Sequence, residues 1–262
     1  MSRGVAKVDV ERDGAITTVS IDRFAEARNA VDPETAALLR EAFLAFDRDD
    51  TQSVAILTGR GGSFCAGFDL KVAAARTGTS LGDPAGPGAM GPTRDLLSKP
   101  VIAAVEGYAV AGGLELALWC DLRVASATAR FGVFCRRWGV PLIDGGTVRL
   151  PRLIGHSRAL DMILTGREVG AEEAFAWGLA NRLAPAGEAL AEARALALEI
   201  AKFPQLCMRS DRQSSYDQWG FDLAAALVHE GRLGAPALQQ ESRAGAARFA
   251  AGKGRGGDFG NI

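Results

Sequence analysis

The chain has 262 residues, of which 48% are hydrophobic and 23% charged, and its formal net charge is −1. This is the composition of a globular protein, and the length suffices for one large domain or two small ones. The near-zero charge argues against a nucleic-acid-binding protein, and no apolar run reaches the roughly 18 residues of a membrane-spanning helix.

The cysteines and histidines exclude other classes of site. The four cysteines lie far apart without a Cys-x-x-Cys pair, so we expect no disulfide framework and no metal site. Unpaired cysteines and an N-terminus without a signal-peptide core predict a cytoplasmic location. We interpret the two histidines, His156 and His229, as surface or capping residues rather than catalysts.

The first part of the chain predicts a hairpin, a helix and a buried strand. Two alternating runs within residues 5–22 flank Asp13 and Gly14, a tight-turn pair. Asp32, followed by proline, opens a helix that extends to about Asp47. Residues 54–58 form a short continuous apolar run, typical of a strand that is covered on both faces.

The middle of the chain repeats this pattern. Residues 100–105 predict a second buried strand, 112–120 a helix and 122–125 a third strand. Alternating strands and helices favour an α/β layered fold with parallel crossovers. We interpret the Gly- and Pro-rich stretch 77–92 as a mobile loop, with a lid over a ligand as the alternative.

The C-terminal third of the chain predicts mainly helices. From His156 onward the only strand pattern is at residues 180–183, and helical periodicity extends to Phe249. This region is typical of a second subdomain or an oligomerisation layer. The glycine-rich tail after Ala250 is expected to be frayed.

Two glycine-rich loops, residues 61–70 and 106–115, each follow a buried strand and precede a predicted helix. Small residues there allow a ligand to approach the backbone and leave N–H groups that the sheet does not pair. Two such groups converging on one point can stabilise a developing oxyanion. Tight strand–helix turns without a ligand remain the alternative. Neither loop has the pattern of a phosphate-binding or dinucleotide-binding loop.

These loops resemble the signature segments of the crotonase superfamily, the enoyl-CoA hydratases and isomerases. The similarity includes FCAGFDL at residues 64–70 and GYAVAGGLELALWCDLRVAS at residues 107–126. It continues in order through Phe131-Gly132, GGT at 145–147, LPRLIG at 150–155 and LTGR at 164–167. The resemblance therefore covers essentially the whole chain.

The resemblance implies an α/β fold with a β-β-α spiral core over residues 1–195 and a helical trimerisation region over residues 196–262. It implies an acyl-CoA substrate, with no cofactor apart from the coenzyme A of the substrate, and a homotrimer or dimer of trimers. The backbone N–H groups of Ala66 and Gly112 would form the oxyanion hole. The predicted substrate-binding residues are Arg28, Ala66, Gly67, Phe68, Asp69, Leu70, Gly112, Cys135 and Trp138.

Glu115 is the first predicted catalytic residue. It follows Gly112 by three residues, which is close to one helical turn, so its carboxylate lies on the same side as the Gly112 N–H. A buried carboxylate beside an apolar pocket can act as a general acid or base. The alternative is a carboxylate that complements the dipole of its own helix.

The second glutamate of the hydratases is absent. Its position by the resemblance is Cys135, and no carboxylate occurs from Arg130 to Ile143. Arg136 and Arg137 could lower the pKa of this thiol. The nearest replacement is Asp144, which resembles the second acid–base group of dienoyl-CoA isomerases. Capping of the following helix is the alternative role for Asp144.

We therefore predict an enoyl-CoA hydratase-like lyase that hydrates 2-enoyl-CoA, or catalyses the reverse reaction, with an oxyanion hole and Glu115. The first alternative is an enoyl-CoA or dienoyl-CoA isomerase that uses Glu115 and Asp144. A non-catalytic acyl-CoA-binding protein is the second. RNA binding, known for a few members of the superfamily, is disfavoured by a pI near 6.2.

Overall fold

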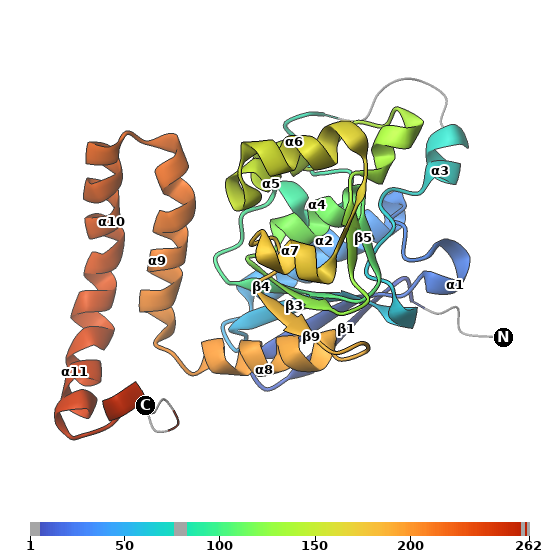
Figure 1. Cartoon of the computed structure of the whole chain (residues 1–262). Helices are drawn as coiled ribbons and strands as arrows, with labels where there is room; N and C mark the ends of the chain where they lie inside the picture. Colours follow the sequence, from blue (N-terminus) through green and yellow to red (C-terminus); the bar gives the residue numbers. More distant parts are fainter. Residues whose placement is uncertain (1–5, 76–82, 258–259, 261–262) are drawn as a thin grey trace. The chain divides into compact units, whose positions relative to one another are not determined.

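A computed structural model describes residues 6–75, 83–257 and 260 of the chain (Figure 1). The chain divides into two compact units, Met1–Ala197 and Leu198–Ile262. The first unit holds both sheets, and the second is helical. The two units are described separately below.

The N-terminal hairpin and the following helix are confirmed. Strands β1 (Val8–Asp13) and β2 (Ile16–Ile21) pair antiparallel, with Asp13 opposite Ile16 across a two-residue turn. After the short helix α1 (Phe24–Ala27), helix α2 (Pro33–Arg48) begins. Its N-cap is Asp32, whose carboxylate accepts a hydrogen bond from the Thr35 N–H at 2.8 Å.

The larger sheet has six strands in the order β1-β2-β3-β4-β6-β9. Its remaining strands are β3 (Val54–Gly59), β4 (Val101–Val105), β6 (Leu122–Ser126) and β9 (Arg182–Ala184). Every neighbouring pair from β2 to β9 is parallel. The continuous apolar sequences of β3 and β4 fit their burial on both faces.

The smaller sheet has the order β5-β7-β8, formed by β5 (Tyr108–Val110), β7 (Arg130–Gly132) and β8 (Glu168–Gly170). Strands β4 and β5 and helix α4 (Gly112–Trp119) follow one another, so each sheet receives one strand before the helix. Strands β6 and β7 and the 3-10 turn η3 (Phe134–Trp138) repeat this order. The first loop joins the small sheet through a parallel bridge between Cys65 and Ala109.

Helix α4 is the central helix of this unit, because all of its residues are buried. Around the core lie α3 (Leu70–Ala75), α5 (Gly146–Ile154), α6 (His156–Thr165), α7 (Ala171–Ala176) and α8 (Ala189–Ala201) (Figure 1). The expectation of a single strand after His156 was wrong, since β8 also lies there. This strand has only three residues and ends in glycine, so it carries no readable alternation.

The second unit contains α9 (Gln205–Asp217) and α10 (Leu223–Ala237), which pack side by side (Figure 1). A π-helical segment, Leu238–Ser242, connects α10 to α11 (Arg243–Ala250). His229 on α10 pairs with Asp217 at 2.8 Å. Residues 258, 259, 261 and 262 of the predicted frayed tail lie outside the described residues. Among the residues that are described, no helix has the length and apolarity to cross a membrane.

Candidate active site

The two glycine-rich loops lie against each other. The Cys65 N–H donates to the Tyr108 carbonyl at 2.8 Å, and the Val110 N–H donates to the Cys65 carbonyl at 3.1 Å. A Cβ atom on Gly67 would lie 3.0 Å from the nitrogen of Gly112, and one on Gly113 would lie 2.1 Å from the Cys65 carbonyl oxygen. Only glycine fits so close an approach of two backbones.

The backbone N–H groups of Ala66 and Gly112 are available to a ligand. Both residues line one cavity. Within residues 6–75, 83–257 and 260, neither amide donates a hydrogen bond to the protein. Gly112 is the first residue of α4, where an N–H has no partner within the helix. The preceding Ala111 has φ 54°, a strained value for a residue other than glycine.

The cavity has a volume of about 290 Å³ and a largely apolar wall with two carboxylic acids, Glu115 and Asp144. The first loop and α3 contribute one side of the wall, residues 134–144 contribute another, and Ala89 and Met90 complete it. Of the sequence-predicted residues, the cavity wall includes Ala66, Phe68, Leu70, Gly112, Glu115, Cys135, Trp138 and Asp144.

Glu115 lies on the first turn of α4, and its side chain is 3% exposed. Its Oε1 accepts hydrogen bonds from the N–H groups of Asp144 and Gly146, both at 2.8 Å. Burial raises the pKa of Glu115 to about 7, since the Gly146 hydrogen bond opposes this effect only in part and the Asp144 charge adds to it. Glu115 therefore faces the start of α5, in contrast to the alternative in which it complements only its own helix.

Asp144 does not cap α5, so that alternative was wrong. The N-cap position belongs to Gly145, which makes no side-chain cap. The Oδ1 of Asp144 instead accepts hydrogen bonds from the Met90 N–H at 3.1 Å and the Thr93 hydroxyl at 2.5 Å. The residue is 2% exposed and lies in the cavity wall near Glu115.

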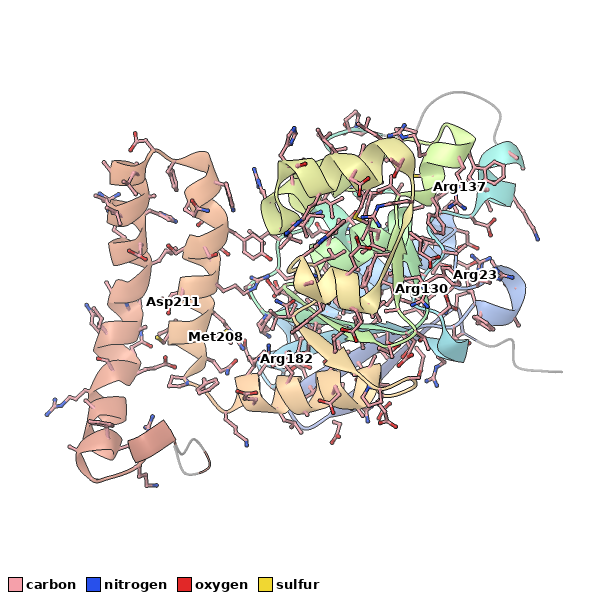
Figure 2. The ribbon with its side chains drawn as sticks, viewed as in Figure 1. Arg23, Arg130, Arg137, Arg182, Met208 and Asp211 are labelled. Atoms are coloured by element: carbon pink, nitrogen blue, oxygen red, sulfur yellow. The ribbon has the colours of Figure 1, made fainter. Side chains whose placement is uncertain are left out.

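Cys135 occupies the cavity wall with a thiol whose pKa is raised, chiefly by burial and further by the charge of Glu115. Of the two arginines that could lower this pKa, Arg136 does so, but burial and the Glu115 charge outweigh it. Arg136 donates to the Ile163 carbonyl. Arg137, which is labelled in Figure 2, lies over the Phe134 ring and donates to the Gly166 carbonyl. Trp138, which is 68% exposed, also lines the cavity.

Three predicted substrate contacts lie outside this wall: Arg28, Gly67 and Asp69. Arg28 is exposed at the end of α1. The carboxylate of Asp69 accepts a hydrogen bond from the Lys71 N–H at 3.0 Å. It also pairs at 3.3 Å with the buried Arg23, which is labelled in Figure 2. Asp69 therefore stabilises the start of α3 and the first loop.

Sequence reasoning missed Ala89 and Met90, which come from the stretch interpreted as a loop or lid. Residues 77–82 of that stretch lie outside the described residues. The part from Gly88 onward is packed, and Met90 is 1% exposed. The available signal was the methionine itself, since this residue type is usually buried and is unexpected in an exposed Gly- and Pro-rich segment.

A model of the enoyl-CoA hydratase/isomerase family matches residues 11–252. The chain belongs to this family. The family predicted from the two loop motifs is thereby confirmed.

Individual relatives agree with this assignment. An enoyl-CoA hydratase of Mycobacterium tuberculosis, EchA19, is 42% identical over 199 residues, which cover 73% of each chain. A carnitinyl-CoA dehydratase of Salmonella arizonae is 40% identical over 200 residues, or 75% of each chain. A solved enoyl-CoA hydratase from Mycobacterium tuberculosis superposes with a TM-score of 0.87 at 37% identity, covering 94% of this chain and 96% of that one. The predicted fold class is confirmed by this superposition.

Proposed function

We propose that this protein is an acyl-CoA lyase that hydrates 2-enoyl-CoA thioesters or dehydrates the corresponding 3-hydroxyacyl-CoA. The observation that carries the proposal is the combination of Glu115, buried with a pKa of about 7, and two backbone amides that line the same cavity and donate to no group among the described residues. The family and the names of its similar members, a hydratase and a dehydratase, support the same class of reaction.

The thioester carbonyl oxygen would accept hydrogen bonds from the Ala66 and Gly112 N–H groups. In hydration, the Glu115 carboxylate takes a proton from water while the water oxygen bonds to the β-carbon. The π electrons shift toward the thioester oxygen, where the two amides stabilise the enolate. The protonated Glu115 then returns the proton to the α-carbon. A carboxyl group with a pKa near the operating pH suits both the taking and the giving of this proton.

One carboxyl group is sufficient for these reaction steps, because the proton that leaves the water is the proton that reaches the α-carbon. Cys135, whose pKa is raised, is neutral near pH 7 and gives the wall a small, weakly polar surface. Phe68, Leu70 and Trp138 would contact the substrate along the cavity wall. Arg28, Gly67 and Asp69 remain predicted contacts of the coenzyme A portion outside it.

Isomerisation is the second candidate, favoured by the presence of Asp144 in the same wall as Glu115. In that reaction one carboxyl group would remove a proton from the substrate carbon chain and the other would deliver one at a different carbon. Both reactions pass through an enolate whose oxygen the same two amides would stabilise, a 3-hydroxy enolate in hydration and a conjugated dienolate in isomerisation. They differ in whether water adds to the β-carbon or a proton is moved from one carbon to another.

We also propose that the protein assembles as a homotrimer or a dimer of trimers, with the coenzyme A moiety of the substrate as its only cofactor-like group. The second unit supports assembly, because several of its large apolar side chains are more than half exposed: Trp219, Leu223, Leu227, Val228, Leu238 and Phe249. Large apolar side chains exposed in this number on one helical unit are available for protein–protein contacts.

The test is mass spectrometry of products from 2-enoyl-, 3-enoyl- and dienoyl-CoA substrates in heavy water. Hydration adds the mass of heavy water to a 2-enoyl-CoA, whereas isomerisation exchanges hydrogen without that addition. We expect water addition. Turnover of 3-enoyl- or dienoyl-CoA alone would assign the isomerase reaction, and binding of every thioester without turnover would overturn both.

A further inference from the structure

The segment from Gly88 to Arg94, part of the cavity wall, is held to the start of α5 by polar contacts between residues about 50 positions apart. The Met90 N–H and the Thr93 hydroxyl both donate to the Oδ1 of Asp144, at 3.1 and 2.5 Å. Arg149 on α5 donates to the carbonyl oxygens of Asp144, at 3.0 Å, and Thr93, at 2.7 Å. Thr93 is 1% exposed and Asp144 2%, so water does not compete for these bonds.

These contacts reach both halves of the proposed catalytic machinery. On one side, the backbone N–H of Asp144 donates to Glu115 at 2.8 Å, so the position of Asp144 fixes a donor to the acid–base residue. On the other side, the Met90 side chain packs on Gly112, because a Cβ atom added to Gly112 would lie 2.5 Å from the Met90 sulfur. Met90 therefore supports the backbone that presents the Gly112 N–H.

We propose that Thr93 and Arg149 are positioning residues that fix the segment from Gly88 to Arg94 to the start of α5, a linkage that we call the lock. The lock thereby holds the Gly112 N–H and the Glu115 carboxylate in fixed positions relative to each other. This inference rests on the proposed function and adds two residues that do not line the cavity. The packing at Gly88 supports it, because a Cβ atom there would lie 2.0 Å from the Thr93 hydroxyl and 2.4 Å from the Asp144 Oδ1. Such contact leaves the segment little freedom to shift while the bonds are intact.

The test compares Thr93→Val, which removes the hydroxyl at nearly constant shape, with Thr93→Ser, which keeps it. Thr35→Val is the matched control, since the Thr35 hydroxyl also donates to a buried aspartate, Asp32, at 2.7 Å, but at the start of α2. For the enoyl-CoA that the wild type consumes, we expect T93V to lower kcat about tenfold or more, as for loss of a buried hydrogen bond to a charged group. KM should change little, T93S should recover most of the loss, and T35V should leave kcat unchanged.

A second readout does not depend on catalysis. The sequence has four methionines, so the spectrum of protein labelled with ¹³C-methyl methionine is simple, and Met90→Leu identifies the Met90 signal. We expect T93V to move or broaden this signal and T93S and T35V to leave it in place. If the wild type consumes no enoyl-CoA, the proposed function fails, yet a moved Met90 signal still supports the lock.

An unchanged Met90 signal in folded T93V would overturn the lock, and an unchanged kcat in an active protein would overturn the positioning role. If T93V does not fold, Arg149→Met replaces it, because it removes the two bonds to the carbonyls of Asp144 and Thr93. The Met90 signal then decides, because Arg149 also lowers the pKa of Glu115 and its removal would alter kcat without the lock.

Discussion

The N–H of Gly146, at the start of α5, donates to the Oε1 of Glu115 on α4 at 2.8 Å. The acid–base residue proposed here is therefore tied to the end of a helix other than its own. Glu106 makes a similar contact elsewhere, with its Oε1 accepting from the N–H of Ala189 at the start of α8 at 2.9 Å. Glu115 and Glu106 therefore provide a matched comparison between a carboxylate inside the cavity and one outside it.

Glu115→Gln should lower kcat by about 10²–10⁴-fold, the usual contribution of a general acid–base residue. Glutamine keeps a carbonyl oxygen for the N–H groups of Asp144 and Gly146, so we expect the fold to persist. Steady-state kinetics and a thermal melt measure the two properties. Glu106→Gln should keep both activity and fold. Full activity in E115Q would remove Glu115 from the mechanism.

The buried Glu115 should also make stability depend on pH. Its folded-state pKa is about 7, above the ordinary value of 4.5, so the folded protein binds more protons between these values. The stabilisation that this provides is complete below pH 4.5 and is lost as pH rises through 7. Relative to E115Q, the free energy of unfolding of the wild type should fall by about 3 kcal/mol over that interval. Denaturant unfolding at several pH values checks this, and parallel curves for the two proteins would contradict it.

Asp144→Asn should move the acidic limb of the kcat/KM profile to lower pH. The charge of Asp144 raises the pKa of Glu115, and asparagine removes this charge while keeping an Oδ1 acceptor for Met90 and Thr93. Deprotonated Glu115 would then persist at a lower pH. If Asp144 instead transfers protons, the variant loses isomerisation altogether. A limb that stays in place would show that the two carboxyl groups do not interact.

Gly67→Ala should impair the oxyanion hole beyond its effect on the backbone. Gly67 has φ 99°, and a Cβ atom there would lie 2.9 Å from the Ala111 Cβ and 3.0 Å from the Gly112 nitrogen. Gly62→Ala is the control, since Gly62 has φ 82° and a Cβ atom on it would meet nothing within 4 Å. We expect similar backbone strain in both but a loss of kcat only in G67A. If G67A and G62A had the same kcat, the Gly112 amide would have no part in the reaction.

Much of the fold could be predicted because its signals are local. The buried strands β3 and β4 are short apolar runs, and Asp32 followed by proline marks the start of α2. Glu115 could be placed near the Gly112 N–H from their three-residue spacing alone. Strand β8, by contrast, is defined by pairing with β7 rather than by its own three residues.

The partners of Asp144 could not be predicted from the sequence. Met90 and Thr93 are more than 50 positions from Asp144, and no periodicity relates them. An aspartate that caps a helix and an aspartate that bonds to a distant segment can stand at the same position in the sequence, so the sequence does not distinguish the two roles. Only the packing of Gly88 to Arg94 against α5 decides between these roles.

The oxyanion donors proposed here, Ala66 and Gly112, act through backbone rather than side-chain atoms. Replacing Cys135 therefore leaves the means of activating a thioester in place. Across a lineage, such a scaffold can exchange one fate of the enolate for another through single substitutions in the cavity wall, without first giving up substrate activation.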